Sequence, residues 1–487
     1  MPTTKLKLFN NYPLNEKFFD EVFKTTDEVK KVYEDLLSTL DEFTIDEYKM
    51  LNEYAKRSFM SRGVTFATYN ENPRGVERIF PFDLLPRIIS KTEWDTLSKG
   101  LLQRTKAINL FLKDIYNDQH IIKDGIVPAD LLFSSSNYCQ FMKGFTPPGD
   151  AYCHISGTDL IRHSDGEFYV LEDNVRCPSG VSYVMENREA MKKSLSQIFK
   201  QFNISTISEY PARLLEVLKS VAPKGTAEPT CVVLTPGAYN SAYYEHTYLA
   251  QSMGIQLVEG SDLFVENDFV YMNTVYGAKR VDVVYRRIDD DYIDPLVFKE
   301  DSLLGVPGIM SAYKKGNVTL VNAPGTGVAD DKAVYIYVPE IIRYYLNEEP
   351  ILKNVPTYRC GIKEDLDYVL EHLPELVVKP VDQSGGYGIF MGHTATAEDV
   401  ENEKKRILAN PRDYIAQPIM NLSTHATYIE SKETFEPRHI DLRAFTLIGN
   451  NKEFVLSGGL SRVALKEGNL VVNSSQGGGS KDTWIVE

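Results

Sequence analysis

The chain has 487 residues, of which 43% are hydrophobic and 25% charged, a globular balance that excludes a disordered or collagen-like protein. At about 150 residues per domain, this length predicts roughly three domains. The formal net charge of −15 argues against nucleic acid or an anionic membrane as the main partner.

Targeting and redox signals are also informative. No apolar run approaches the roughly 18 residues of a membrane-spanning helix, and the first residues lack the apolar stretch of a signal peptide. The five cysteines are odd in number and form no CxxC pair. We therefore expect a cytoplasmic protein with reduced thiols, without a disulfide framework or a zinc site.

The first region, residues 1–204, begins with a mostly helical pattern over residues 15–125. One helical face is predicted because its apolar residues recur in steps of three, four or seven; they are Trp94, Leu97, Leu101, Ile108, Phe111 and Ile115. Thr92 and Asp95 have the spacing of a capping box at the start of this helix. A further helix is predicted over residues 187–202.

Between these helices, residues 155–175 have the pattern of two strands joined by a hairpin. Asp165 and Gly166 separate two alternating apolar runs, which predicts a two-residue turn. Residues that face each other across such a turn have numbers that add up to 331. This register places Asp159 directly opposite Glu172.

The face that carries these acids has further features. Asn174 projects from it two residues farther on, and Gly157, opposite Asn174, is expected to leave that corner open. Deeper on the face the register places two apolar residues, Ile161 and Val170. Opposed carboxylates destabilise a sheet, so a positive charge should lie between them. Two carboxylates and an amide oxygen suit Mg²⁺. The alternative is a solvated hairpin with a polar face.

The second region, residues 205–328, alternates strands and helices. This rhythm predicts an α/β layer with a partly parallel sheet. Residues 223–229 are the best candidate for a linker. The predicted strands cover residues 230–237, 255–258, 281–285 and 318–321.

The third region, residues 329–487, contains a candidate phosphate site. A predicted strand over residues 376–379 ends on Lys379, and a glycine-rich loop follows. Glycines let backbone N–H groups approach phosphate oxygens, and an adjacent lysine supplies charge. The alternative is a glycine-rich hairpin turn beside an ordinary lysine. The loop is not a Walker A motif, and its candidate binding residues are Ser384, Gly385, Gly386 and Gly388.

Other cationic residues have positions that suit anion binding. Lys332 follows a glycine turn at the expected start of a helix. Arg443 and Arg462 lie in or beside strands, which can hold an arginine rigidly toward an anion. Each arginine taken alone also fits a surface or structural role. Arg286 and Arg287 end an apolar strand, where either a ligand or solvent would meet them.

Together these motifs resemble the ATP-grasp superfamily, the fold of carboxylate–amine ligases such as glutathione synthetase. Lys332 looks like its first lysine, Lys379 its second lysine, and residues 384–388 its glycine loop. Gln417 lies in the strand that resembles the adenine hinge, where many relatives have an acid, so the adenine contact there is expected through the backbone. Later anion-binding positions are matched by Asp441, Arg443, Arg462, Asn473 and the glycines at 477–479.

In that superfamily the metal-binding residues are the last motif along the chain, but in this sequence the matching residues come before the other motifs. They are Asp159, Glu172 and Asn174, followed by Arg176. The chain therefore resembles the circularly permuted ATP-grasp family, related to glutathionylspermidine synthases, over nearly its whole length. The resemblance implies an α/β (α+β) fold with an N-terminal helical region. It also implies a pre-ATP-grasp α/β domain at residues 205–328, which helps to hold the acceptor, and a nucleotide-binding part at residues 329–487.

The leading functional hypothesis is an ATP-dependent ligase that joins a carboxylate to an amine through an acyl phosphate. The resemblance implies ATP and Mg²⁺ as cofactors, with Arg443, Arg462 and Arg176 stabilising the charge that develops during the reaction. Two alternatives stay open: a degenerate ATP-binding or scaffold protein, and an ATP-grasp phosphotransferase. The sequence identifies neither the substrates nor the oligomeric state.

Overall fold

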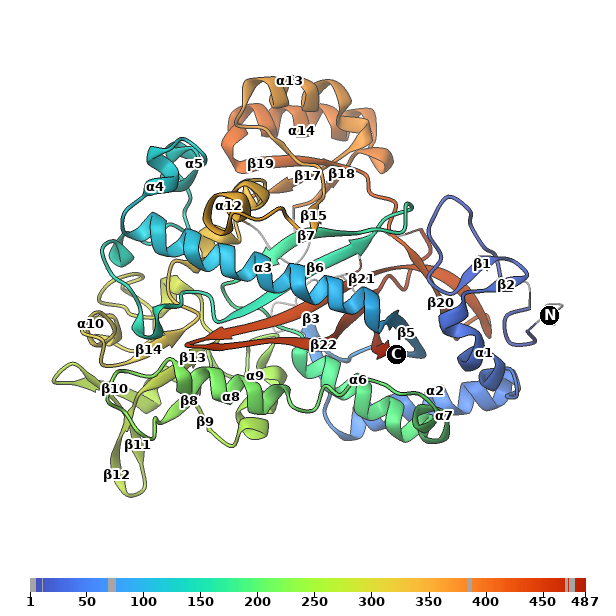
Figure 1. Ribbon diagram of the computed structural model, residues 1–487, viewed down its shortest axis with the longest axis horizontal. Helices are drawn as coiled ribbons and strands as arrows, with labels where there is room; N and C mark the ends of the chain where they lie inside the picture. Colours follow the sequence, from blue (N-terminus) through green and yellow to red (C-terminus); the bar gives the residue numbers. More distant parts are fainter. Residues whose placement is uncertain (1–5, 11, 69–75, 383–387, 469–471, 473–477) are drawn as a thin grey trace.

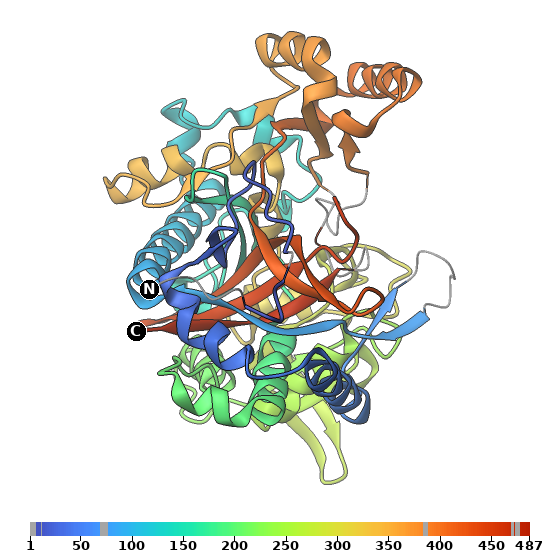
Figure 2. The ribbon, with the colours of Figure 1, turned by 90° about the vertical axis from the view of Figure 1, so that its right-hand side faces the viewer.

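The computed structural model describes residues 6–10, 12–68, 76–382, 388–468, 472 and 478–487. Figures 1 and 2 both show three tiers, with a large sheet in the middle. A smaller sheet with two helices lies on one side of it, and a layer that ends in a projecting hairpin lies on the other. The mixed α/β class predicted from the sequence is therefore confirmed.

The central sheet has the order β15–β7–β6–β21–β22–β23–β5 within the described residues, and β20 also pairs with β21. Neighbouring strands are antiparallel except in the pairs β15–β7 and β23–β5, which are parallel. This sheet therefore joins early and late parts of the chain. Its strands are β5 (Phe82–Ser90), β6 (Ile155–Arg162), β7 (Phe168–Asn174), β15 (Lys353–Asn354), β20 (Thr424–Ile429), β21 (Thr434–Gly449), β22 (Lys452–Val463) and β23 (Gly479–Val486).

Helices cover both faces of the central sheet (Figure 1). Helix α3 (Lys91–Tyr116) packs on one face, where Trp94 and Leu101 join Leu160 and Leu442 in one apolar cluster. Helices α6 (Val181–Ser194) and α8 (Tyr210–Ser220) pack on the other face, in the cluster that contains Phe445. Because side chains alternate along a strand, Asp159 and Arg443 belong to the α6 side of the sheet.

The predicted face of α3 is confirmed, but the start of the chain is less helical than predicted. Strands β1 to β5 interrupt the helices between residues 23 and 90. Strand β5 is buried along almost its whole length because both faces of the sheet are covered, so it lacks an alternating pattern. The predicted cap at Thr92 was wrong: Ser90 caps α3, accepting a hydrogen bond from the N–H of Glu93 at 3.3 Å.

The second region forms the predicted α/β layer. Its main sheet has the order β14–β13–β8–β9, and every pair is parallel. Helix α9 (Tyr243–Met253) connects β8 to β9 and ends at Gly254, which has a left-handed φ of 67°. The strands are β8 (Cys231–Leu234), β9 (Gln256–Val258), β13 (Val283–Arg286) and β14 (Thr319–Val321). A three-stranded antiparallel sheet projects from the layer: β10 (Leu263–Glu266), β11 (Phe269–Thr274) and β12 (Gly277–Val281).

The smaller tier is an antiparallel sheet in the order β16–β19–β17–β18. Val378 and Ala416 lie on its helix-covered face, in one cluster with residues of α13 (Lys363–His372) and α14 (Ala397–Ala409). Lys379 therefore belongs to the opposite face. The strands are β16 (Tyr358–Arg359), β17 (Leu376–Pro380), β18 (Phe390–Met391) and β19 (Tyr414–Pro418).

The remaining elements connect and brace these tiers. The predicted helix at residues 187–202 is in fact α6, which starts earlier, followed by α7 (Ser196–Gln201). Among the described helices, none combines the length and apolar character needed to cross a membrane. The other elements are β1 (Phe23–Thr25), β2 (Glu28–Val29), α1 (Glu34–Leu40), α2 (Ile45–Ser61), β3 (Thr65–Thr68), β4 (Val76–Ile79), α4 (His120–Lys123), α5 (Ala129–Phe133), α10 (Ile309–Lys314), α11 (Lys332–Tyr335) and α12 (Val338–Leu346).

Candidate active site

The β6–β7 hairpin brings the two predicted acids together. Asp159 lies opposite Glu172, and Gly157 opposite Asn174, so the register predicted for these four residues is confirmed. The amide nitrogen of Asn174 donates a hydrogen bond to the carbonyl oxygen of Gly157 at 3.1 Å. This bond fixes the orientation of the side chain and leaves its amide oxygen as the group that can meet a cation.

The turn of this hairpin differs from the prediction. The N–H of His163 donates to the carbonyl of Glu167 at 3.0 Å, so three residues form the turn instead of Asp165 and Gly166 alone. Gly166 supplies the left-handed residue, with a φ of 83°. The register shifts at residue 171, so Leu160 lies opposite Val170 where Ile161 was predicted. This bulge restores the predicted pairing at the acids.

The corner at Gly157 is filled, although the sequence suggested that it is open. A Cβ atom added to Gly157 would lie 2.9 Å from the Cβ of Pro178 and 3.6 Å from the Cδ of Arg443. Glycine is therefore required because a proline and an arginine approach the backbone closely.

Asp159 is bound by both predicted arginines. It is 1% exposed. Its Oδ1 accepts from Arg443 Nε at 2.6 Å, and its Oδ2 accepts from Arg443 Nη2 and Arg462 Nη2, each at 2.8 Å. Burial raises the pKa of Asp159, but the two guanidinium charges outweigh it and hold that pKa well below its usual value. Arg462 also donates to Asp441, whose pKa is raised by burial.

Glu172 lies between two cationic side chains. Lys332 Nζ is 3.4 Å from Glu172 Oε2, and Arg443 Nη2 is 3.9 Å from Glu172 Oε1. Arg443 thus contacts both acids and supplies the positive charge predicted between them. Lys332 is the first residue of α11, as the sequence predicted, and the side chain of Asp331 caps this helix.

Lys379 reaches the same site from the smaller sheet. Strands β17 and β19 pair Val377 with Gln417, so Lys379 and Gln417 are diagonal neighbours on one face. Lys379 Nζ donates to Gln417 Oε1 at 2.7 Å, and Gln417 Nε2 donates to Thr357 Oγ1 at 2.9 Å. Both polar groups of the Gln417 side chain therefore have protein partners, and the adenine contact through the hinge backbone stays a prediction.

The electrostatics place Lys379 near the acid pair. Burial and the nearby Lys332 lower the pKa of Lys379, while Glu172 and Asp159 raise it, and the net result is a pKa of about 8. These four side chains, from the hairpin, α11 and β17, are therefore within electrostatic range of one another. Two lysines, Lys332 and Lys379, are thus available here to a phosphate chain.

Part of the predicted phosphate loop and of the later anion-binding positions lies outside the described residues. This applies to Ser384, Gly385 and Gly386, and also to Asn473 and Gly477. Gly388 is described, is exposed, and has a left-handed φ of 69°, which favours glycine.

Arg176 lies just beyond the hairpin, among acids. Its Nε is 3.6 Å from Asp289 Oδ1 and 3.7 Å from Asp330 Oδ2. Asp330 also accepts a hydrogen bond from the N–H of Val175 at 2.5 Å. Burial raises the pKa of Asp330 to about 7 despite the charge of Arg176. Asp330 was not among the predicted site residues, although it lies two residues before Lys332.

Arg286 and Arg287 are structural ties between the α/β layer and the hairpin. Arg286 Nε donates to the carbonyl of Asn322 at 2.7 Å. Arg287 Nη1 donates to the carbonyl of Pro178 at 2.7 Å, and its Nη2 lies 3.2 Å from Glu245 Oε1. Both arginine side chains are buried, so the solvated strand end considered from the sequence was wrong for them.

The predicted cation ligands fit Mg²⁺ by chemistry, with one constraint. Glu172 and Asn174 present a carboxylate and an amide oxygen, hard donors of the kind this ion prefers. Asp159 already accepts three hydrogen bonds, and only Oδ1 among its oxygens takes a single one. In the described part of the chain no three histidine, cysteine, aspartate or glutamate side chains are grouped to hold a metal, and the predicted set contains only two carboxylates.

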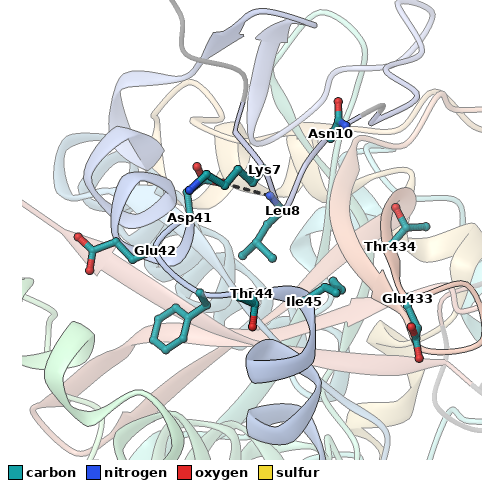
Figure 3. A pocket seen from close by; sticks show the side chains of 10 residues that line it. Lys7, Leu8, Asn10, Asp41, Glu42, Thr44, Ile45, Glu433 and Thr434 are labelled. Carbon is teal, nitrogen blue, oxygen red and sulfur yellow. Dashed lines mark hydrogen bonds between the residues drawn. The ribbon is translucent and has the colours of Figure 1, made fainter.

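A separate pocket of about 350 Å³ lies away from these residues (Figure 3). It is enclosed by the N-terminal segment, the turn between α1 and α2, and the β20–β21 turn. The N–H of Leu8 donates to Asp41 Oδ1 across it at 3.1 Å. Its charged residues are Lys7, Asp41, Glu42 and Glu433, and none of them was a predicted site residue.

Comparisons with known proteins identify relatives of this chain. Residues 86–464 match the family model described as circularly permuted ATP-grasp type 2. An uncharacterised protein of Synechocystis sp. is 52% identical over 470 residues, which cover 96% of this chain and 97% of that protein. A Frankia casuarinae protein, whose name assigns it provisionally to the glutamate–cysteine ligases, is 41% identical over 96% of this chain. This chain spans only 53% of the Frankia protein's length.

The fold also has a counterpart among solved structures. The glutathione synthetase like-effector of Globodera pallida, in its apo form, superposes with a TM-score of 0.56. The alignment covers 90% of this chain and 98% of that one, at 12% sequence identity. A likeness at this identity concerns the fold alone.

Proposed function

The chain belongs to the circularly permuted ATP-grasp type 2 family, and we propose that it is an ATP-dependent carboxylate–amine ligase that forms an amide bond through an acyl phosphate. The permuted ATP-grasp fold predicted from the sequence is confirmed by the family match and by the superposition. The Frankia relative supports ligation of amino acid substrates, because its name is that of a glutamate–cysteine ligase.

One observation carries this proposal: Glu172 is contacted by Lys332 and Arg443 at the edge of the hairpin, and the buried Lys379 lies in the same field of charge. Four cations, Lys332, Lys379, Arg443 and Arg462, surround the two acids, so the positive charge here exceeds that of the two carboxylates. Such a site can accept a further anion together with a divalent cation, because the cation offsets the added negative charge.

The nucleotide would lie between the central sheet and the smaller β16–β19–β17–β18 sheet. Lys332 and Lys379 would bind its phosphates, and Gln417 would hold Lys379 in place while the hinge backbone contacts adenine. Glu172, Asn174 and Asp159 would hold Mg²⁺, which supplies charge neutralisation at the transferred phosphoryl group. The loop with Ser384, Gly385, Gly386 and Gly388 would cover the phosphates and exclude water from the acyl phosphate.

The reaction would proceed in two steps. A substrate carboxylate oxygen attacks the γ-phosphorus, forming the acyl phosphate as the bond to ADP breaks. The amine nitrogen then attacks the acyl carbon, phosphate leaves, and the nitrogen loses a proton to give the amide. Arg443, Arg462 and Arg176 would stabilise the negative charge that develops on the oxygens at each step.

The acceptor would lie at the carboxyl edge of the parallel sheet. Ligands of α/β layers usually bind outside the carboxyl ends of the strands, where the strand order reverses. Here the order reverses between β8 and β13, and β13 runs directly into Arg287, which bonds the segment after the metal ligands. We infer that residues 205–328 form the acceptor-binding part and residues 329–487 the nucleotide-binding part, while residues 1–204 supply the metal ligands.

The test is ADP release across pairs of carboxylate and amine substrates. Wild-type protein should release ADP only when a suitable pair is present, and the product mass should show an amide adduct. A stable phosphorylated product would identify a phosphotransferase instead. Glu172→Gln should abolish release, whereas Glu403→Gln, a buried glutamate of α14, should leave it unchanged. Nucleotide binding without release for any pair would favour the scaffold alternative.

A further inference from the structure

Asn322 is a buried residue at the carboxyl end of β14, in the α/β layer. It is 1% exposed and follows Val321 directly. Its own carbonyl accepts from Arg286 Nε at 2.7 Å, which fixes its backbone. Neither the family resemblance nor the spacing of motifs pointed to this residue.

The side chain of Asn322 joins both ends of the metal-binding hairpin. Its Oδ1 accepts from the N–H groups of His154 and Ile155 at 2.6 and 2.8 Å, where β6 begins. Its Nδ2 donates to the carbonyls of Ile155 and Val175 at 2.7 and 2.8 Å, and to that of Arg176 at 3.3 Å. One amide thus bonds the backbone before the first acid and the backbone just after Asn174.

These bonds need the amide chemistry of asparagine. The two N–H groups require an acceptor, and the three carbonyls require a donor, within a side chain of fixed length. Aspartate has the same shape but presents acceptors on both sides, so it would face three carbonyl oxygens without a donor. Leaving buried polar groups unpaired is costly, so the hairpin ends would separate at this point.

The separation would act on the cation ligands. Val175 is the next residue after Asn174, and Asn174 pairs with Gly157 at the end of the hairpin away from its turn. A shift of the Val175 backbone therefore moves the amide oxygen of Asn174 relative to Glu172. It also moves Arg176, whose carbonyl is bonded by Asn322.

We propose that Asn322 is a positioning residue for the divalent-cation site, through which the α/β layer sets the geometry of the Asn174 and Arg176 end of the hairpin. This inference rests on the proposed function, because it assumes that a cation and ATP bind at the hairpin. Asn322 itself contacts neither the cation nor the substrates.

The chain offers a matched control in Asn109 of α3. Its Oδ1 accepts from the N–H groups of Tyr152 and Cys153, each at 2.9 Å, and its Nδ2 donates to the carbonyls of Thr105 and Cys153 at 3.1 and 2.8 Å. Asn109 therefore fixes the segment that leads into β6 with the same chemistry, but it does not reach the end of β7. Asn322→Asp and Asn109→Asp remove the same kind of donor.

The experiment measures the dissociation constant of the ATP analogue AMP-PNP by calorimetry, in EDTA and in saturating Mg²⁺, together with the thermal unfolding midpoint. The dissociation constant in EDTA divided by that in Mg²⁺ reports how strongly the cation strengthens nucleotide binding. We expect Asn322→Asp to reduce this ratio about tenfold or more, the usual effect of removing a partner outside the metal ligands. Asn109→Asp should keep the wild-type ratio even if its unfolding midpoint falls.

The outcomes separate this inference from the proposed function. A wild-type protein whose AMP-PNP affinity does not respond to Mg²⁺ would overturn both. If the wild type responds to Mg²⁺ and the ratio for Asn322→Asp is within twofold of the ratio for Asn109→Asp, the positioning role alone is overturned. If Asn322→Asp does not fold, the pair Asn322→Ser and Asn109→Ser decides by the same ratio, because serine keeps a donor and an acceptor in less volume.

Discussion

Replacing Gln417 by glutamate tests how the site keeps a buried lysine charged. Lys379 Nζ donates to the neutral amide oxygen of Gln417 at 2.7 Å, and burial lowers the pKa of Lys379 to about 8 from an ordinary 10.5. A glutamate side chain has the same shape as glutamine and would place a negatively charged oxygen beside Lys379 Nζ. We expect Gln417→Glu to stabilise the protein without ligands and to weaken its binding of ATP.

The magnitude follows from linkage. Below pH 8 the folded and the unfolded wild type both hold the Lys379 proton. The lowered pKa then costs about 3.5 kcal/mol, from the 2.5 units between 10.5 and about 8 at roughly 1.4 kcal/mol each. Between pH 8 and 10.5 only the unfolded state keeps the proton, so stability rises with pH. A carboxylate partner raises a lysine pKa by about 1–3 units. This rise corresponds to about 1.4–4 kcal/mol. After about 1 kcal/mol for the lost bond to Thr357, we expect a net gain of roughly 0.4–3 kcal/mol at pH 7.

Urea unfolding between pH 7 and 10 measures this effect, and calorimetry measures ATP affinity. The rise in stability above pH 8 should be smaller in Gln417→Glu than in the wild type, and the ATP dissociation constant should increase about tenfold, since the new carboxylate competes with phosphate for Lys379. Gln417→Leu separates charge from hydrogen bonding. The reasoning is refuted if Gln417→Glu is less stable than Gln417→Leu at pH 7, or if the pH dependence near 8 is unchanged.

Three further experiments probe the charges around the hairpin. Arg104→Met should lower the free energy of unfolding by about 3–5 kcal/mol in urea, since it leaves the buried Asp173 unpaired; a loss below about 1 kcal/mol would contradict this. Arg462→Met should cost a similar amount, and adding Asp441→Asn should recover at least about 1 kcal/mol in a double-mutant cycle, because the two acids left behind repel each other. Burial raises the pKa of Glu21, but two arginines outweigh this effect and lower that pKa to about 2 from 4.5. Glu21 therefore contributes about 3 kcal/mol to the free energy of unfolding above pH 4.5, and this contribution is lost as the pH falls through 2. Glu21→Gln should therefore flatten the acid limb of the stability curve measured in urea between pH 5 and 2, and an unchanged limb would exclude this role.

The sequence predicted those parts of the fold that have a local signal. The apolar face of α3 repeats with the helical period, and the acids Asp159 and Glu172 follow from alternation across a short turn. The same local pattern gave the wrong turn. The turn has one residue more than predicted, and a bulge at residue 171 compensates for it. Because the two changes cancel, the alternation near the acids reveals neither of them. Strand β5 was missed because a strand buried on both faces shows no alternation and runs directly into α3.

The contacts that form the site lie beyond local signals. Arg443 and Asp159 are 284 residues apart, and their pairing depends on the register of β21 against β6. The resemblance supplied the arginines as anion-binding residues, but it gave no indication that they bind Asp159. Asn322 and Asp330 were not predicted as site residues, because single polar residues after a strand are common and only the folded hairpin shows what they bond.

The order of the chain in the central sheet has a consequence for synthesis. Strands β6 and β7 leave the ribosome long before β21 and β22, which carry the arginines that neutralise Asp159. At about 5–20 residues per second, the 284 residues between Asp159 and Arg443 take roughly 15–60 s to translate. A hairpin that formed during that interval would have facing carboxylates without their arginines and a strand edge without its neighbour β21, so we expect it to become stable only when the C-terminal strands arrive.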